Sequence, residues 1–121
     1  MNRRVLIVED QEDNRRILRD TLRRAGFEVI EAANGKAALE RAGETPPDIV
    51  LMDVQLPDID GYTVAIRMRE IPALRDTPII AVTSFAFTGD EERAEQAGCS
   101  AYVAKPVSPK RLLEKINELI G

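Results

Sequence analysis

Five polar residues stand just after short apolar runs, and their side chains could form a metal site together. Glu9 and Asp10 follow one run, and Asp53, Thr83 and Lys105 each follow another. Three carboxylates brought close together repel one another, so some would stay protonated unless a cation intervened. Ligand sets made only of oxygen atoms favour Mg²⁺ over zinc or copper. If the fold gathers these residues, we expect a magnesium site with an ammonium and a hydroxyl beside it.

The apolar runs predict the elements that would position these side chains. Continuous runs of this kind are typical of strands covered on both faces, as in a parallel sheet. They span residues 5–8, 49–52, 79–82 and 101–104, and a less uniformly apolar run at 27–32 is expected nearer a sheet edge. Helical patterns alternate with them, over about 13–25, 34–43, 61–70, 88–97 and 108–121. The alternation predicts an α/β fold with helices on both faces of the sheet and right-handed crossovers. The strand ends, and with them the five polar residues, should meet at one edge.

Asp53 is the residue around which this pattern is arranged. The run Ile49–Met52 leads straight into it, and a turn-rich loop over 54–61 follows. Burying a carboxylate without a partner costs several kcal/mol, so we interpret Asp53 as a chemical group held in place by the fold. Asp58 and Asp60, within the loop, are expected to be solvated or to cap a helix.

The helix after the first strand is expected to bury one apolar stripe and to leave its arginines in water. Asp13 or Asn14 can cap it. The stripe, at helical spacing, consists of Ile17, Leu18, Leu22 and Ala25. The remaining positions carry Arg15, Arg16, Arg19, Arg23 and Arg24. Further caps are expected at Asn34, at Thr88 with Glu91, and at Ser108 before Pro109.

Composition bounds the class of protein. The 121 residues are 44% hydrophobic and 31% charged, which predicts a single folded domain over 1–121. The net charge of −4 argues against nucleic acid as a partner. No stretch approaches the roughly 20 apolar residues of a membrane span, and residues 1–4 lead directly into a strand without a signal peptide. We therefore expect a cytoplasmic chain that does not contact a membrane.

Two residue counts exclude whole classes of chemistry. Cys99 is the only cysteine, so no internal disulfide can form. There is no histidine, which removes Ser-His-Asp and Cys-His catalysis and histidine zinc sites. If histidine chemistry is involved, a partner must supply it.

Taken together, the motifs resemble those of the response-regulator receiver domains. They are Glu9-Asp10, Leu51-Met52-Asp53, Leu56-Pro57 with Asp60-Gly61, Thr83, Gly98 with Tyr102, and Lys105-Pro106. The match covers essentially the whole chain, and the chain is most similar to stand-alone receivers such as the cell-cycle regulators of the DivK type. The resemblance implies a flavodoxin-like, doubly wound sheet of five parallel strands in the order 2-1-3-4-5, flanked by five helices.

The resemblance also implies a function for the acidic residues and the lysine. Asp53 would accept a phosphoryl group from a phosphohistidine on a histidine kinase or a histidine phosphotransfer protein. Mg²⁺ would be held by Asp10, Asp53 and the backbone carbonyl of Gln55, with Glu9 acting through water. Lys105 would neutralise charge on the phosphoryl oxygens. The chain would be a signalling switch rather than an enzyme.

The family resemblance extends to a switch and to partner surfaces. Thr83 would hydrogen-bond a phosphoryl oxygen, and Tyr102 would move into the space that Thr83 leaves. The Lys105-Pro106 bond would be cis. A downstream effector would bind a face near the fourth helix and fifth strand, formed by Phe85, Phe87, Tyr102 and Val103. In the family the first helix helps to dock the phosphodonor, which would involve Arg15 and Arg19.

Other readings of the same residues stay open at this point. The chain could be a receiver-like scaffold that signals without phosphorylation, although the acceptor Asp53 and Lys105 are both present. It could also be a receiver cut from a hybrid histidine kinase. A phosphatase with an aspartyl nucleophile usually carries a second acid two residues later, where this chain has Gln55. A flavodoxin-like electron carrier would need a phosphate-binding loop after the first strand, which the sequence lacks.

Overall fold

A single parallel sheet forms the centre of the molecule. The computed structural model describes residues 3–84 and 90–121, and within these ranges the five strands are ordered β2-β1-β3-β4-β5. They are β1 (Arg4–Val8), β2 (Glu28–Ala32), β3 (Ile49–Asp53), β4 (Ile79–Thr83) and β5 (Ala101–Ala104), all paired in parallel. The strand order 2-1-3-4-5 is confirmed. The order reverses direction at β1 and β3, and these are the strands that lead into Glu9 and Asp53.

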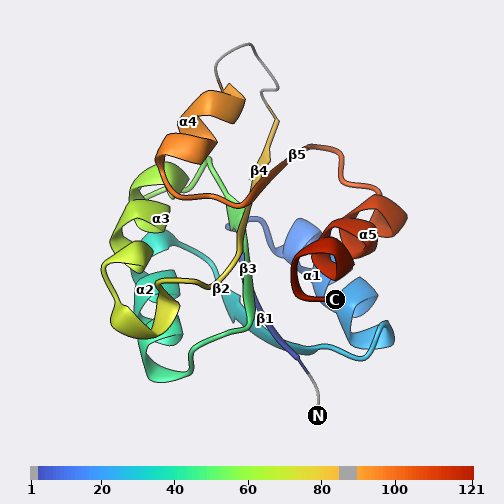
Figure 1. The fold of residues 1–121 in the computed structure, drawn as a ribbon. Helices are drawn as coiled ribbons and strands as arrows, with labels where there is room; N and C mark the ends of the chain where they lie inside the picture. Colours follow the sequence, from blue (N-terminus) through green and yellow to red (C-terminus); the bar gives the residue numbers. More distant parts are fainter. Residues whose placement is uncertain (1–2, 85–89) are drawn as a thin grey trace.

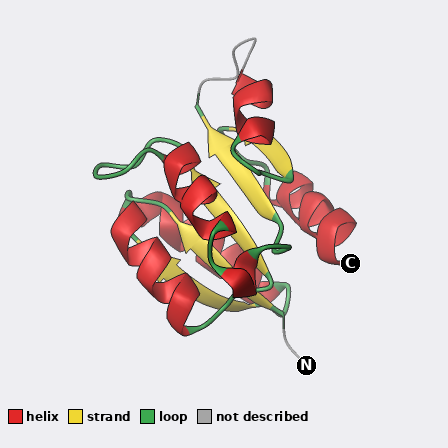
Figure 2. Cartoon of the chain, turned by 60° about the vertical axis from the view of Figure 1, so that its left-hand side comes forward, coloured by secondary structure: helices red, strands yellow, loops and turns green. Residues whose placement is uncertain are grey.

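Helices cover both faces of the sheet (Figure 1). Within the described ranges they are α1 (Glu12–Arg24), α2 (Gly35–Glu44), α3 (Gly61–Arg69), α4 (Asp90–Gln96) and α5 (Pro109–Ile120), with a short 3₁₀ helix η1 (Pro72–Leu74). Helices α1 and α5 lie together on one face, and α2, α3 and α4 lie on the other (Figure 1). Figure 2, turned by 60°, shows the second group in front of the strands. This doubly wound arrangement confirms the predicted α/β fold.

The two layers of helices enclose two separate apolar cores, because successive strand residues point to opposite faces. Leu6 and Val8 of β1 face α2 and α3, whereas Val5 and Ile7 face α1 and α5. All residues of β3 and β4 are buried, but β2 is only partly covered, as predicted for an edge strand. None of the described helices has the length and apolar character that a membrane span requires.

Helix α1 differs from its prediction at its start and in its buried face. It begins at Glu12 with Gln11 as the N-cap, so Asp13 and Asn14 lie inside the first turn and do not cap it. Ile17 was expected in the core, but its side chain is 57% exposed. Ala25, the last member of the predicted stripe, is also exposed, and Leu18 and Leu22 are the members that pack in the core. Since neighbouring helix residues differ by about 100° around the axis, Ile17 is turned outward when Leu18 faces the sheet.

The other helix ends agree with their predictions where the structure describes them. The Asn34 side chain accepts a hydrogen bond from the Ala37 N–H at 2.8 Å, and Ser108 accepts one from the Arg111 N–H at 3.5 Å. Helix α2 ends at Glu44, one residue beyond the predicted stop at Gly43. The expected cap residue Thr88 lies outside the described residues, although α4 begins at Asp90.

Candidate phosphoryl-acceptor site

Asp53 is the last residue of β3, and its side chain is 4% exposed. The two oxygens accept hydrogen bonds from different donors. The Gln55 N–H lies 3.0 Å from Oδ1, and the Lys105 ammonium lies 3.0 Å from Oδ2. Because the four preceding strand residues are fully packed, the carboxylate is held at a fixed point on the edge of the sheet.

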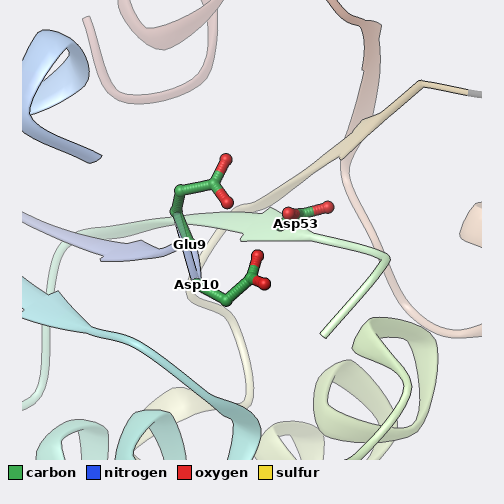
Figure 3. Close-up of side chains that lie close together, drawn as sticks. All are labelled: Glu9, Asp10 and Asp53. Atoms are coloured by element: carbon green, nitrogen blue, oxygen red, sulfur yellow. The ribbon is translucent and has the colours of Figure 1, made fainter. Parts of the chain in front are cut away.

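Glu9 and Asp10 bring two further carboxylates to the same point. One oxygen from each of Glu9, Asp10 and Asp53 lies within 4.8 Å of the others. Figure 3 shows the Glu9 and Asp10 side chains leaving neighbouring backbone positions on opposite sides, with their carboxyl ends turned toward Asp53. Glu9 is buried and Asp10 is exposed, so the cluster is closed on the Glu9 side and open on the Asp10 side.

Lys105 compensates part of this negative charge. Its ammonium lies 3.2 Å from Glu9 Oε1 as well as 3.0 Å from Asp53 Oδ2. Burial opposes the lysine's charge, but hydrogen bonding and attraction to Asp53 and Glu9 outweigh it and raise the pKa of Lys105. Burial, reinforced by the charge of Asp53 and opposed by the Gln11 N–H bond, raises the pKa of Glu9 to about 6. The single positive charge of Lys105 does not balance the negative charges of three ionised carboxylates. Of the three, Glu9 is the carboxyl group whose ionisation is made harder.

The donor set fits a hard divalent cation. Three carboxylates from two strand ends supply only oxygen atoms, which is the ligand type of Mg²⁺. A cation bound among them would stabilise all three carboxylates at once. The Gln55 backbone is tied to the site through its N–H, but whether its carbonyl is a ligand stays a prediction.

The predicted switch residues, Thr83 and Tyr102, lie on the neighbouring strands β4 and β5. Thr83 is the last residue of β4 and is 2% exposed. Its carbonyl accepts a hydrogen bond from the backbone N–H of Lys105 at 2.7 Å, which joins the ends of β4 and β5 beside Asp53. Tyr102 is half-buried in β5, where it packs against the core on the α4 side. The Lys105–Pro106 peptide bond is cis.

Comparison with known proteins gives the same family as the geometry. The model of the response regulator receiver domain matches residues 5–117. The chain belongs to the response regulator receiver domain family. It is 46% identical to the polar-differentiation response regulator DivK of Brucella anthropi, over 100% of this chain and 98% of that protein.

Two solved structures share the whole fold of this receiver domain. The chemotaxis protein CheY4 of Vibrio cholerae is 28% identical, with a TM-score of 0.95 over 98% of this chain and 99% of that one. The receiver domain of a sensor histidine kinase of Pseudomonas aeruginosa is 36% identical, with a TM-score of 0.92 over 100% of this chain and 99% of that one. That structure has a magnesium ion coordinated in its active site cleft.

A cavity of about 430 Å³ adjoins the acidic site of the receiver domain. Its lining includes Glu9 and Lys105 from the site, and Asn14, Ile17 and Leu18 from α1. The segment after β5, with Pro106 and Val107, forms another wall. The exposed Ile17 thus belongs to a largely apolar recess beside Glu9 and Lys105.

The structure places only some of the residues that were predicted to bind partners, and it does not leave those fully exposed. Phe85 and Phe87 lie outside the described residues. Val103 is 5% exposed and packs in the core with α5, which corrects the expectation that it forms part of an exposed face. Arg15 and Arg19 are not free in solvent either, because both pair with Glu31 of β2, at 3.2 Å and 3.1 Å.

Sequence reasoning missed two contacts that shape the site of the receiver domain. The Asp58 carboxylate accepts hydrogen bonds from the Gly35 and Lys36 N–H groups at 2.8 Å and 2.9 Å, so the loop after β3 caps helix α2. Capping was one of the two roles expected for Asp58, but nothing in the sequence identifies a helix 23 residues away as the one it caps. The second contact joins Arg15 to the Glu9 carbonyl.

The Cys99 thiol is poorly suited to nucleophilic chemistry. It is partly buried against the core, and burial, opposed by the nearby Arg69 charge, raises the pKa of its thiol to about 11. A thiol with this pKa is almost entirely protonated at neutral pH and is a poor nucleophile.

Proposed function

We propose that this receiver domain, residues 1–121, is a phosphorylation switch that takes a phosphoryl group onto Asp53 from a phosphohistidine of a kinase or phosphotransfer protein. The observation that carries the proposal is the gathering of Glu9, Asp10 and Asp53 within 4.8 Å, with the Lys105 ammonium 3.0 Å from Asp53. The chain has no histidine of its own, so the phosphohistidine belongs to the partner. The proposed setting is the cytosol, where such kinases present their phosphohistidines.

The proposed reaction is a direct transfer between two side chains. An oxygen of the Asp53 carboxylate attacks the phosphorus, the P–N bond of the phosphohistidine breaks, and its electron pair stays on the imidazole nitrogen. The product is an acyl phosphate on Asp53 and a neutral histidine after proton uptake. Little else is required of the protein than to position the carboxylate and stabilise charge on the phosphoryl oxygens.

In this proposal, two positive groups stabilise the negative charge on the phosphoryl oxygens. Glu9, Asp10, Asp53 and the Gln55 carbonyl would hold Mg²⁺, which supplies positive charge to the phosphoryl oxygens when bound. Lys105 supplies a second positive charge from the end of β5, where it already lies 3.0 Å from the accepting carboxylate. Its link through the backbone to the Thr83 carbonyl keeps it close to β4.

Phosphorylation would be read out at Thr83 and Tyr102. Thr83 is the last residue of β4, which pairs with β3, so a phosphoryl group on Asp53 would lie close to Thr83. A hydrogen bond from the Thr83 hydroxyl to the phosphoryl group would change the packing against which Tyr102 lies. Such a switch must favour the active state by about 5.5 kcal/mol to invert a 1:99 mixture. The face near α4 and β5 would then bind the downstream effector.

The test is phosphorylation by a small donor. Incubation with acetyl phosphate and Mg²⁺, followed by intact mass measurement, is expected to show one added phosphoryl group. Asp53→Asn should remove it, since the nucleophilic carboxylate is lost. Addition to the Asp53→Asn protein, or no addition to the unaltered protein, would refute the proposal.

A further inference from the structure

We propose that Arg15 is a positioning residue for the metal site, because it fixes the peptide that carries Asp10. This inference rests on the proposed function, since it concerns the ability of the same acidic cluster to bind Mg²⁺. Arg15 lies on α1 and donates from Nη1 to the Glu9 carbonyl at 2.9 Å. The Glu9 carbonyl belongs to the peptide that joins Glu9 to Asp10, so this hydrogen bond acts directly on the backbone of both acidic residues.

Arg15 is itself held in place from the other side. Its Nε donates to Glu31 Oε1 at 3.2 Å, and the two side chains are only 19% and 27% exposed. Glu31 lies on β2. The next residue of this strand, Ala32, accepts a hydrogen bond from the Glu9 N–H through its carbonyl, at 3.0 Å. The backbone of Glu9 is therefore bound at its N–H by β2 and at its carbonyl by a guanidinium that β2 anchors.

The two acids of the β1 end differ in what else holds them. The Glu9 carboxylate accepts from the Lys105 ammonium and from the Gln11 N–H, at 3.2 Å each. The Asp10 carboxylate is exposed and makes no hydrogen bond or ion pair to any residue in 3–84 or 90–121. The direction of the Asp10 side chain toward Asp53 thus depends on its backbone, and Arg15 is the side chain that fixes this backbone.

Arg19 provides a natural comparison within the same cluster. It pairs with Glu31 at 3.1 Å, as Arg15 does, but the hydrogen bond to the Glu9 carbonyl comes from Arg15. Removing either arginine takes one positive charge from the neighbourhood of the acidic cluster, and by charge alone this change would strengthen Mg²⁺ binding. Loss of positioning would weaken it. The sign of the change in affinity therefore separates the two effects.

The experiment is a calorimetric titration of Mg²⁺ into the metal-free protein and its variants. Arg15→Gln is expected to raise the Mg²⁺ dissociation constant about tenfold, the usual scale for residues that orient metal ligands. Arg19→Gln should leave the constant unchanged or lower it. Arg15→Lys keeps the charge but has one nitrogen in place of the planar fork, so it should also raise the constant. In the metal-free protein, the NMR signal of the Asp10 amide should shift in both Arg15 variants and stay in place in Arg19→Gln.

The outcomes distinguish this inference from the proposed function. If the unaltered protein binds Mg²⁺ and is phosphorylated, but both Arg15 variants bind Mg²⁺ as well as Arg19→Gln does, the inference is overturned and the proposed function stands. If the unaltered protein binds no Mg²⁺, both are overturned. Thermal unfolding of each variant shows whether it is folded, and should Arg15→Gln fail to fold, Arg15→Lys and the Asp10 amide signal decide the question.

Discussion

At the scale of single residues, Asp53 is positioned by tight backbone packing as well as by its hydrogen bonds. Gly61, the first residue of α3, lies against the backbone of Asp53 and Val54, and its N–H donates to the Val54 carbonyl at 3.0 Å. A Cβ atom at this position would come within 2.6 Å of the Val54 Cα and closer still to the Asp53 carbonyl oxygen. Only glycine allows α3 to start this close to the acceptor strand.

We therefore expect Gly61→Ala to displace the acceptor. The backbone of Asp53 or of α3 must shift, which should lower the free energy of unfolding by about 1–3 kcal/mol. The shift should also slow phosphorylation by acetyl phosphate in the protein that remains folded. Urea denaturation and the time course of labelling measure the two effects.

Gly43→Ala is the matched control for this change. Gly43 also lies in a helix, but no atom comes within 4 Å of an added Cβ there. Alanine should stabilise α2 by about 0.5–1 kcal/mol and leave labelling unchanged. Equal labelling rates for Gly61→Ala and Gly43→Ala would show that the close packing at Gly61 does not position Asp53.

At the scale of elements, the loop after β3 is tied to a helix on the same face of the sheet. Asp58 caps α2 from outside, with one oxygen on the Gly35 N–H and the other on the Lys36 N–H. The cap joins the loop that carries Gln55 to a helix start next to β2. These hydrogen bonds, from Lys36 first and then from Gly35, lower the pKa of Asp58 below its usual 3.8.

The lowered pKa predicts how the cap depends on pH. A carboxylate that is easier to ionise in the folded state stabilises the fold above its unfolded pKa of 3.8, and this contribution disappears as the pH falls through the lower folded value. Asp58→Ala should therefore lower the melting temperature at neutral pH, and the difference from the unaltered protein should narrow in acid below pH 3.8. Thermal unfolding followed by circular dichroism between neutral and acidic pH measures this.

Asp76→Ala supplies the control for the cap. Asp76 is exposed just after η1 and makes no hydrogen bond or ion pair within the described parts of the chain. Its loss should leave the melting temperature nearly unchanged at every pH. A difference between Asp58→Ala and the unaltered protein that does not vary with pH would contradict the ionised cap.

At the scale of the whole molecule, a contact could be predicted from sequence where each of its residues is marked locally, for example by the end of a strand, and not otherwise. Asp53, Thr83 and Lys105 each end a strand that the chain itself marks, and parallel topology then brings them to one edge without any knowledge of side-chain contacts. Arg69 shows the opposite case. Its guanidinium donates to the Gly98 carbonyl at 2.7 Å and to the Leu74 carbonyl at 2.8 Å, which joins α3, η1 and the end of α4.

The contacts that sequence could not predict have no local signature. Backbone carbonyls exist at every residue, so no sequence feature shows that Gly98, 29 residues from Arg69, would be the partner. The same holds for Arg15 and the Glu9 carbonyl. The exposure of Ile17 depends on how α1 is rotated about its own axis. The sequence does not fix this rotation, because Ile17 and its neighbour Leu18 are both apolar and either could face the sheet.

The position of Ile17 gives a prediction about how the whole molecule meets its phosphodonor. Among the large hydrophobic residues that the structure describes, Ile17 and Ile66 are exposed to solvent, with exposed fractions of 57% and 49%. Ile17 lines the cavity beside Lys105, on the α1 and α5 face, whereas Ile66 is on α3, on the opposite face of the sheet. Under the proposed function, a protein that delivers a phosphohistidine to Asp53 would approach this edge, where the apolar recess at Ile17 is available for contact.

We expect Ile17→Ser to weaken docking without disturbing the chemistry. For a phosphohistidine protein that phosphorylates the unaltered chain, the KM should rise about tenfold, which corresponds to about 1.4 kcal/mol. Labelling by acetyl phosphate should not change, because the small donor needs no docking surface, and stability should change by less than about 0.5 kcal/mol at this exposed position. Ile66→Ser removes a similarly exposed side chain from the far face, and phosphorylation by both donors should be unaffected. A KM that rises equally in the two variants would mean that loss of an exposed apolar residue, rather than its place beside the acceptor, causes the effect, and docking at the α1 recess would then be ruled out.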